Sequence, residues 1–353
     1  MKIKNIITLA VCGAFLASLA GWCFLGSTPE YSNSERRVLA KFPSVSAESV
    51  INGDFAGDFE EYATDRFPLR DLWRSLKAYT RLGVFLQKDN NEIFVKDGHI
   101  SKLNYPMNKP MADHAIALFR QIKERYLGEN SVYFAMIPDK NEELADLKPD
   151  YAAFESYMAA GMPYATNVSL RDLLSPEDYY YTDTHWRQEQ IVDVADRLAA
   201  TMGVSLSKEY RQVTVESPFY GVYAGQSALH CEPDTITYLT NETIKNSKVE
   251  GANAVYDLSK AEGKDPYELF LSGNQPIVKV TNPAKSGGKR LILFRDSFGS
   301  SIAPLLAEGY AEVVLVDLRY IGSAMLGQYV DFQNADVLFL YSTVLLNESL
   351  SLR

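Results

Sequence analysis

The sequence predicts an α/β fold built on a mainly parallel sheet. Four short apolar runs, bounded by polar or charged residues, have the length and composition of buried strands: residues 132–137, 291–294, 312–316 and 337–340. Patterns of amphipathic helices lie between them, and strands that alternate with helices are typical of a parallel sheet with helical crossovers. A chain of 353 residues is long enough to bury such a core.

Residues 1–27 predict an N-terminal signal anchor. Lys2 and Lys4 precede a stretch that is apolar from residue 6 to residue 25, about the ~20 residues that cross a bilayer. Trp22 lies near its outer end, where aromatic side chains anchor at the interface, and the positive charges favour an N-inside orientation. A cleaved signal peptide, which usually has a shorter apolar region, is the alternative.

Residues 28–130 are expected to form a juxtamembrane segment and a helical and hairpin extension that packs on the core. The aromatic residues of a first helix recur at helical spacing on one face: Phe55, Phe59 and Tyr62. A second amphipathic pattern runs from residue 70 towards residue 86. Asp97-Gly98 predicts the turn of a β-hairpin, which makes His99 a surface strand residue. A further helix over 110–126 places His114 on its solvent side.

Residues 131–353 are predicted to form the main domain. Its first strand ends in Pro138-Asp139-Lys140-Asn141, at the sheet edge where ligands of α/β proteins bind. Helices are predicted over 150–160 and from Arg187 to Gly203, a residue typical of a helix end. An insertion around 208–281 reads as short strands and long loops, and we expect it to shape the substrate site.

The composition excludes several classes of function. Without Lys2 and Lys4 the exported part carries a formal charge of about −12, so neither nucleic acid nor a densely anionic polymer is an expected partner. Neutral sugar chains stay open. Outside the apolar stretch Cys231 is alone, so the soluble part has no internal disulfide. No zinc-type spacing and no glycine-rich nucleotide motif occurs, so no metal or cofactor is predicted.

Ser297 is the candidate nucleophile. It follows the strand 291–294 in the stretch Arg295-Asp296-Ser297-Phe298-Gly299, and a short helix is predicted over 300–306 with Ser300 or Ser301 near its cap. A serine at such a turn has backbone N–H groups beside it, which can hold the oxyanion of an acyl-transfer intermediate. Serines also cap helices throughout proteins, so a purely structural role is the alternative from this stretch alone.

Asp183 and His185 are the candidate orienting carboxylate and general base. A serine hydroxyl becomes nucleophilic when a base takes its proton, and a carboxylate fixes the tautomer of that base. Two residues apart in an extended segment, their side chains leave the same face. Either the carboxylate bonds the imidazole, or both point into one cleft; a helix entry capped by Asp183 or Thr184 is the structural alternative. His230 and Cys231 are read as structural.

Together these stretches resemble a known family. Thr182-Asp183-Thr184-His185-Trp186 and Arg295-Asp296-Ser297-Phe298 are similar to motifs of the DHHW family and of the periplasmic alginate O-acetyltransferases. Thr184 stands where the family name has a histidine. Looser matches are Asp65-Arg66-Phe67-Pro68-Leu69-Arg70, Phe219-Tyr220-Gly221 and Gly273-Asn274-Gln275-Pro276. The resemblance implies an SGNH-hydrolase-like α/β/α domain, circularly permuted because Asp and His precede Ser.

The resemblance also implies a function and further site residues. It implies O-acetylation of an exported cell-surface polysaccharide, the exopolysaccharide of a biofilm, and a neutral, cellulose-like polymer is one expected substrate. A membrane-bound O-acyltransferase would supply the acetyl group to a domain held outside the bacterial cell membrane. The backbone of Phe298 and the side chains of Asn274, Arg319, Tyr341 and Lys140 are the implied or candidate oxyanion and substrate residues. A carbohydrate acetyl esterase, or a silent polysaccharide-binding or assembly module, are the alternatives.

Overall fold

The structure, a computed structural model, describes residues 2–25, 29–32, 34–207 and 209–353. The chain divides into two compact units. One comprises the chain up to Asn91 together with Ala224–His230, and the other comprises Glu92–Tyr223 and Cys231–Arg353. The predicted end of the anchor, at residues 27 and 28, lies outside the described residues, and so does Lys208, where the predicted insertion begins.

The second unit is built on a seven-stranded sheet of order β6-β5-β13-β11-β12-β10-β9. The first five strands in this order are parallel; at one edge β10 pairs antiparallel with β12, and β9 pairs antiparallel with β10. The strands are β5 (Val132–Ile137), β6 (Thr166–Asn167), β9 (Lys248–Glu250), β10 (Ile277–Thr281), β11 (Arg290–Arg295), β12 (Glu312–Val316) and β13 (Ala335–Ser342). The prediction of a mainly parallel α/β sheet is confirmed.

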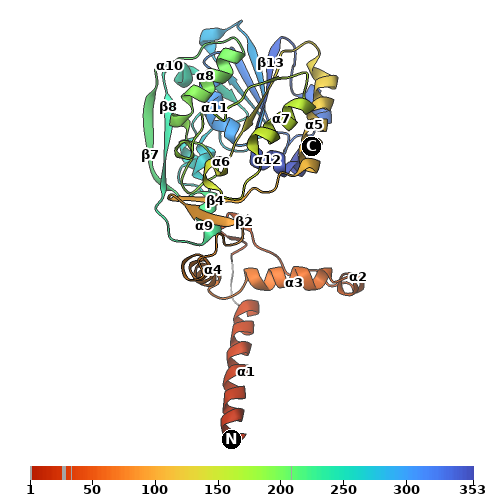
Figure 1. Cartoon of the computed structure of the whole chain (residues 1–353), viewed down its shortest axis with the longest axis vertical. Helices are drawn as coiled ribbons and strands as arrows, with labels where there is room; N and C mark the ends of the chain where they lie inside the picture. Colours follow the sequence, from red (N-terminus) through yellow and green to blue (C-terminus); the bar gives the residue numbers. More distant parts are fainter. Residues whose placement is uncertain (1, 26–28, 33, 208) are drawn as a thin grey trace. The chain divides into compact units, whose positions relative to one another are not determined.

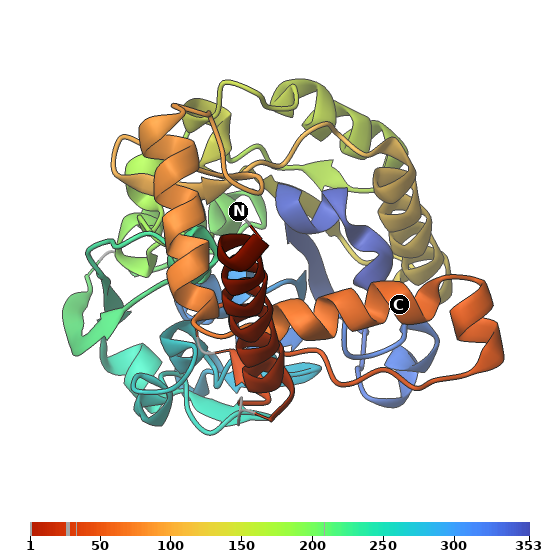
Figure 2. The same cartoon turned by 90° about the horizontal axis from the view of Figure 1, so that it is seen from below.

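Helices cover both faces of this sheet (Figure 1). Alternate residues of a strand point to opposite faces, so Leu293 packs with α8 (Val192–Thr201) and α11 (Phe298–Leu306), whereas Phe294 packs with α5 (Lys109–Ile122) and α7 (Tyr151–Gly161). The short helix α12 (Thr343–Asn347) lies beside α5 (Figure 2). The result is three layers, helix, sheet and helix.

Several segments differ from the sequence prediction. The strands β9 and β10 belong to the central sheet, although the sequence placed them in an insertion. The rest of that region holds a separate two-stranded sheet of β7 (Arg211–Phe219) and β8 (Asp234–Thr240), with α9 (Val222–Ser227) and α10 (Glu242–Asn246). The hairpin of β3 (Ile93–Lys96) and β4 (His99–Lys102) and helix α5 belong to the same unit as the sheet, so this unit begins before residue 131. The remaining helix of this unit is α6 (Asn141–Leu144).

The first unit contains helices and one pair of short strands. Helix α1 (Lys2–Leu25) includes the one span, Ile3–Cys23, that among the described helices is long and apolar enough to cross a membrane. It is followed by β1 (Tyr31–Ser32) paired with β2 (Arg37–Val38), then α2 (Ala47–Ile51), α3 (Asp54–Asp65) and α4 (Arg70–Tyr79), which continues as a π-helical turn over Thr80–Val84. The two amphipathic helices predicted here are therefore present as α3 and α4.

Candidate active site

Ser297 lies at the sheet edge where the parallel strands end. The strands β11, β12, β13 and β5 are mutually parallel neighbours in register, so their carboxyl ends share one edge. Ser297 follows β11 and is the N-cap residue of α11, but its side chain makes no capping hydrogen bond. Helix α11 starts at Phe298, so Ser300 and Ser301, the predicted caps, lie inside it. The hydroxyl of Ser297 is therefore free from the capping role that serines often have.

The structure brings Asp183, His185 and Ser297 together. His185 Nε2 lies 2.7 Å from Ser297 Oγ, and His185 Nδ1 lies 2.6 Å from Asp183 Oδ1. A carboxylate only accepts hydrogen bonds, so Nδ1 carries the proton and donates to Asp183. Nε2 of the neutral ring then has a lone pair facing the serine hydroxyl. This is the arrangement in which an imidazole takes a proton from a serine.

A tight turn positions Asp183 and His185. Tyr179 and Trp186 form a β-bridge, and the Tyr180 N–H donates to the His185 carbonyl, which folds the segment between them back on itself. Asp183 Oδ1 also accepts from the backbone N–H of His185 at 3.1 Å. The Asp183 carboxylate therefore reaches the His185 ring because the chain turns between the two residues. The sequence analysis expected an extended segment instead.

Asp183 is buried and fully satisfied. Its second oxygen, Oδ2, accepts a 2.7 Å hydrogen bond from the Val222 N–H. Burial alone would raise the pKa of this carboxyl, but the charge of a protonated His185 and the hydrogen bonds from His185 and Val222 lower the pKa below its ordinary value. Asp183 therefore stays ionised and can stabilise the imidazolium that forms when His185 takes a proton.

Residues far along the chain hold the turn in place. Asp234 accepts hydrogen bonds from the N–H groups of Tyr181 and Thr182 and from the Thr182 hydroxyl. Gly221 packs so closely that a Cβ would lie 2.3 Å from the Thr182 carbonyl oxygen, so only glycine fits. The Phe219-Tyr220-Gly221 motif drew attention to this segment, but no local pattern marks Asp234.

The imidazole is also held by stacking. The ring of Tyr267 lies 3.8 Å from the His185 ring, centroid to centroid, at an interplanar angle of 12°. Tyr267 donates its hydroxyl hydrogen to Ser301 Oγ at 2.8 Å, and the Trp186 indole N–H donates to the same oxygen. These contacts fix the ring plane. The sequence offered no signal for Tyr267, which lies in a 3-10 helical turn, Pro266–Leu269, within the predicted insertion.

Lys140 holds the turn that carries Asp183 through hydrogen bonds to its backbone. It is buried, and its Nζ donates to three backbone carbonyls: Tyr180 at 2.8 Å, Tyr181 at 3.2 Å and Asp183 at 2.9 Å. Burial lowers the pKa of Lys140 to about 7, although nearby carboxylates oppose this shift. All three ammonium donors of Lys140 are thus directed at the chain itself, and none is left for the substrate contact expected from the sequence.

The backbone N–H of Phe298 is already engaged. It donates to Asp296 Oδ1 at 3.1 Å, so in this conformation it is not the oxyanion donor expected from the sequence. The other oxygen of Asp296 accepts from the Ser342 N–H at 2.8 Å. Asp296 thus ties the β11–α11 turn to the end of β13, and its carboxylate does not serve as a second orienter of His185.

Arg319 and Asn274 are linked beside this turn. Arg319 follows β12, which neighbours β11 in the sheet, and its guanidinium forms a bidentate pair with Asp317, with Nε–Oδ1 and Nη2–Oδ2 distances of 2.9 and 2.6 Å. The same Nη2 donates to Asn274 Oδ1 at 3.2 Å. Because the amide oxygen accepts from an arginine, the Asn274 amide group presents its NH₂ end for another acceptor.

Tyr341 lies behind the site. It is a residue of β13, fully buried, with its ring stacked on Phe119 at a centroid distance of 5.2 Å. Among the described residues its hydroxyl has no hydrogen-bond partner. The expectation that Tyr341 contacts substrate is wrong for this conformation, because position on the correct edge does not decide which face of the strand a side chain occupies.

His99 also differs from its prediction. It is buried, and its ring stacks on Tyr181 at a centroid distance of 4.2 Å, although the sequence placed it on the surface of the hairpin. The hairpin packs against the turn that carries Asp183, since the Ile100 N–H donates to the Tyr181 carbonyl at 2.8 Å. Alternation along a strand cannot show that a loop covers its outer face.

Known proteins share this fold at low sequence identity. No family model and no curated protein matches the sequence. A DHHW family protein from Eubacterium siraeum is similar in structure, with a TM-score of 0.57, 22% identity and coverage of 73% of this chain and 93% of that one. Bacillus cereus PatB1, solved with a sulfonyl adduct, has a TM-score of 0.57 and 18% identity over 72% of this chain and 95% of its own.

A weaker similarity is to the O-acetyltransferase domain of Pseudomonas putida AlgJ, with a TM-score of 0.46 and 12% identity over 73% of this chain and 93% of that one. The motifs around His185 and Ser297 predicted a family resemblance. The structures confirm it at the level of the fold: over 73% and 72% of its length this chain shares the fold of the DHHW family protein and of PatB1.

Proposed function

We propose that this chain is an O-acetyltransferase that acts on an exported polysaccharide through an acetyl-serine intermediate. The observation that carries the proposal is the continuous set of contacts from Asp183 through His185 to Ser297, over distances of 2.6 and 2.7 Å. The shared fold with PatB1, which was solved with a sulfonyl adduct, supports a reactive centre on this scaffold. The family resemblance of the motifs supports acetyl transfer as the chemistry.

In the first step Ser297 Oγ attacks the carbonyl carbon of an acetyl ester. Its proton passes to His185 Nε2, and Asp183 stabilises the imidazolium through the Nδ1–H hydrogen bond. Collapse of the tetrahedral intermediate breaks the bond to the donor oxygen, which leaves with the proton from Nε2. The acetyl group is then held as an ester of Ser297, and His185 is neutral again.

The oxyanion of this intermediate needs fixed donors. The N–H of Phe298 is bonded to Asp296, so we assign the role to the N–H of Ser297 itself and to the NH₂ group of Asn274, whose amide is oriented by Arg319. Arg319 acts here through Asn274, and its positive charge favours negative charge nearby. Asn274 and Arg319 therefore stay site residues in this proposal, and the N–H of Ser297 takes the oxyanion role expected of the Phe298 N–H.

In the second step a sugar hydroxyl attacks the acetyl-serine. His185 takes the hydroxyl proton and returns it to Ser297 Oγ as the new ester leaves, so the enzyme is regenerated. If water takes the place of the sugar, the same steps give an acetyl esterase, which is the second candidate function. The excess of acidic residues suits a neutral acceptor better than an anionic one.

We place the second unit outside the cell membrane, held there by α1. The span Ile3–Cys23 has the length and composition of an anchor, and an anchor would keep the site close to the emerging polymer. A membrane-bound O-acyltransferase that delivers acetyl groups outward would be the partner, as the family resemblance of the motifs implies.

The test is acetyl transfer from an activated acetyl ester to a panel of neutral oligosaccharides. We expect acetylated sugar to form faster than free acetate, and Ser297→Ala to lower both rates by about 10³-fold or more. Ser300→Ala, one turn along the same helix, is the matched control and should keep full activity. An aryl sulfonyl fluoride should add its sulfonyl group once to the protein with Ser297 and not to Ser297→Ala.

The outcomes separate the candidates. Acetate without acetylated sugar would identify an esterase. Unchanged ester turnover in Ser297→Ala would remove Ser297 from the mechanism. No turnover and no sulfonylation in the folded protein would favour the silent binding module.

A further inference from the structure

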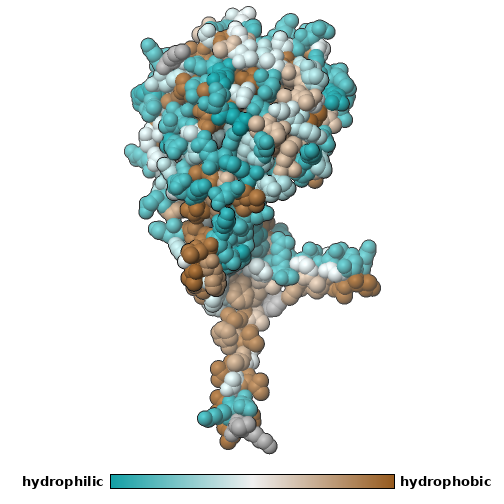
Figure 3. Space-filling model, viewed as in Figure 1, coloured by the Kyte–Doolittle hydropathy of each residue, from teal (hydrophilic) through white to brown (hydrophobic). Residues whose placement is uncertain are grey.

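Helix α4 and the turn after it expose an unusual amount of apolar surface. The side chains concerned are between 49% and 79% exposed: Leu69, Leu72, Trp73, Leu76, Tyr79, Val84, Phe85 and Leu86. The first five recur at spacings of three and four residues, which places them along one side of a helix. Figure 3 shows these apolar residues gathered over α4. Soluble proteins rarely leave so large a continuous patch in water.

The same segment is basic in an acidic chain. Residues 69–88 contain five basic residues and one acidic residue, whereas the whole chain has a formal net charge of −10. Lys77 bonds the amide oxygen of Asn91, and Arg81 bonds that of Gln87, so these contacts do not neutralise their positive charges. A helix with Trp and Leu on one side and Lys and Arg beside them is typical of a helix lying in a membrane interface.

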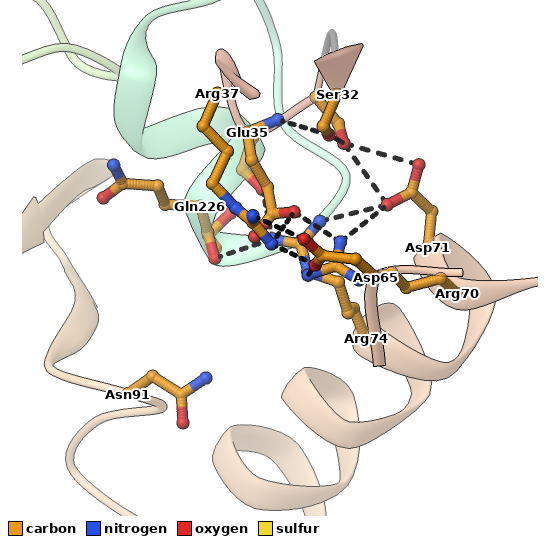
Figure 4. Close-up of polar contacts among 12 residues, drawn as sticks. Ser32, Glu35, Arg37, Asp65, Arg70, Asp71, Arg74, Asn91 and Gln226 are labelled. Atoms are coloured by element: carbon orange, nitrogen blue, oxygen red, sulfur yellow. Dashed lines mark hydrogen bonds and ion pairs between the residues drawn. The ribbon is translucent and has the colours of Figure 1, made fainter. Parts of the chain in front are cut away.

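The polar side of α4 is fixed to the chain that follows the candidate span. Glu35 pairs with Arg70 and with Arg74, whose Nη2 lies 3.5 Å from the Glu35 carboxylate. Arg74 also donates to the Gly225 carbonyl oxygen at 2.8 Å. Figure 4 shows Glu35 among these arginines, with Arg37 and Asp65 beside them. These contacts hold Arg70 and Arg74 away from the apolar side chains.

This attachment limits how far α4 can lie from a membrane crossed by α1. The span ends at Cys23, and Glu35 is only twelve residues further on. A fully extended chain advances at most about 3.5 Å per residue, so Glu35 and the start of α4 stay within about 40 Å of the end of the span. The apolar, basic helix is therefore within reach of the surface from which the anchor emerges.

We propose that the apolar side of α4, with the turn up to Leu86, lies in the interface of the anionic bilayer that α1 crosses. The side chains of Trp73, Tyr79 and Phe85 enter the headgroup region, and Lys77 and Arg81 contact acidic headgroups. The proposal rests on the anchor proposed above but not on the acetyl-transfer chemistry. Its consequence is a second attachment to the lipid, which a single spanning helix would lack.

The test uses the full chain reconstituted in vesicles of phosphatidylcholine and phosphatidylglycerol that contain brominated lipid. The chain has three tryptophans, Trp22, Trp73 and Trp186. Trp22→Phe removes the one in the span, and Trp186 is fully buried in the core, so quenching by bromine reports on Trp73. We expect the brominated lipid to remove roughly a third or more of the emission, and the added change Trp73→Phe to abolish this quenching.

Charge and flotation separate the possible outcomes. The double variant Lys77→Gln/Arg81→Gln should weaken the lipid contact about five-fold for each lost charge, in anionic vesicles only. A chain that floats with the vesicles but shows no Trp73 quenching would overturn the proposal and point to a protein partner or a second copy on α4. A chain that does not float would disprove the anchor and the α4 contact together. Neither readout depends on acetyl transfer.

Discussion

At the scale of single residues, the tautomer and the orientation of the His185 ring are set by the side chains around it. Asp183 sets the protonated nitrogen, Tyr267 sets the ring plane and Ser297 meets the free nitrogen. Each contact comes from a different part of the chain. Removing any one of them should leave the fold and change the chemistry, which makes these positions suitable for mutation.

Asp183→Asn is expected to lower kcat for acetyl-ester turnover by about 10³–10⁴-fold. An amide can donate a hydrogen bond to Nδ1 of His185, which favours the tautomer that carries its proton on Nε2. In that tautomer Nε2 cannot accept the proton of Ser297. Steady-state kinetics on an acetyl ester measure the effect, with thermal unfolding as the control for folding. A loss of less than about ten-fold would mean that the carboxylate does not orient His185.

Lys140→Met is expected to leave the carbonyl oxygens of Tyr180 and Asp183 without donors, whereas the Tyr181 carbonyl keeps the N–H of Ile100. Each loss costs about 1–3 kcal/mol at most, so we expect about 2–4 kcal/mol of lost stability after partial relaxation. We also expect a lower kcat with little change in KM, because the turn that carries Asp183 loosens. Lys140→Arg, which keeps charge and donors, should recover part of the kcat. Unchanged kcat in a destabilised Lys140→Met would show a purely structural role.

At the scale of elements, the site depends on how the β3–β4 hairpin and the 179–186 turn pack together. The hairpin contributes His99, whose ring lies on Tyr181, and the backbone bond from Ile100 to the Tyr181 carbonyl. Lys140, after β5, supports the same turn. Two elements that are remote from this loop in sequence, the hairpin and the end of β5, thus converge on it, and its stability should respond to each of them.

The buried His99 predicts acid sensitivity. Burial, with the charge of Lys140, lowers the pKa of His99 from about 6.5 to about 4. Between these two values the unfolded chain binds a proton that the fold does not, so stability is full above pH 6.5 and is lost as the pH falls towards 4. The charges of Glu177, Arg187 and Asp97 act on the same ring.

We therefore expect the folded protein to lose about 1–2 kcal/mol from this source between pH 7 and pH 4.5. His99→Phe keeps a ring for stacking on Tyr181 and removes the titration. Thermal unfolding over this range should show a smaller loss of Tm in the variant than in the original protein, with similar values at pH 7.5. Parallel curves for the two proteins would contradict the assignment.

At the scale of the whole molecule, the two units contain different candidate functional parts. The second unit contains all the candidate catalytic residues, and the first contains the candidate span, the helices α2–α4 and the cluster around Glu35. In the structure Glu35 pairs with Arg70, and Arg37 bonds both oxygens of the buried Asp65.

Because of this division, we expect a destabilising substitution in the first unit to leave acetyl-ester turnover intact. Asp65 is held ionised: burial raises its pKa, but hydrogen bonds from Arg37 and the Ala40 N–H lower it overall. Asp65→Asn leaves the arginines facing a neutral amide and should cost about 2 kcal/mol. Limited proteolysis should then cut first within residues 29–91, while ester turnover stays within about two-fold. Loss of turnover in the folded variant would refute this independence.

Much of the fold follows from local patterns. The apolar runs at 132–137, 291–294, 312–316 and 337–340 are strands, because a buried strand must be apolar on both faces wherever helices cover both sides. The helices over 150–160 and 110–126 are present because their apolar spacing matches the helical period. The place of β9 and β10 in the central sheet was not predicted, since short alternating strands at a sheet edge resemble those of a surface hairpin.

By itself the sequence determined the strands and helices of the core, the apolar N-terminal span, and the three residues Asp183, His185 and Ser297 as candidates, because periodicity and short motifs are local properties. Only the tertiary structure decided that these three side chains meet, that Tyr267 and Asp234 hold them, that Lys140 binds the backbone of the turn and that the Tyr341 side chain packs on Phe119. Contacts between remote segments depend on strand order and on the face to which each side chain turns, and no local pattern encodes either.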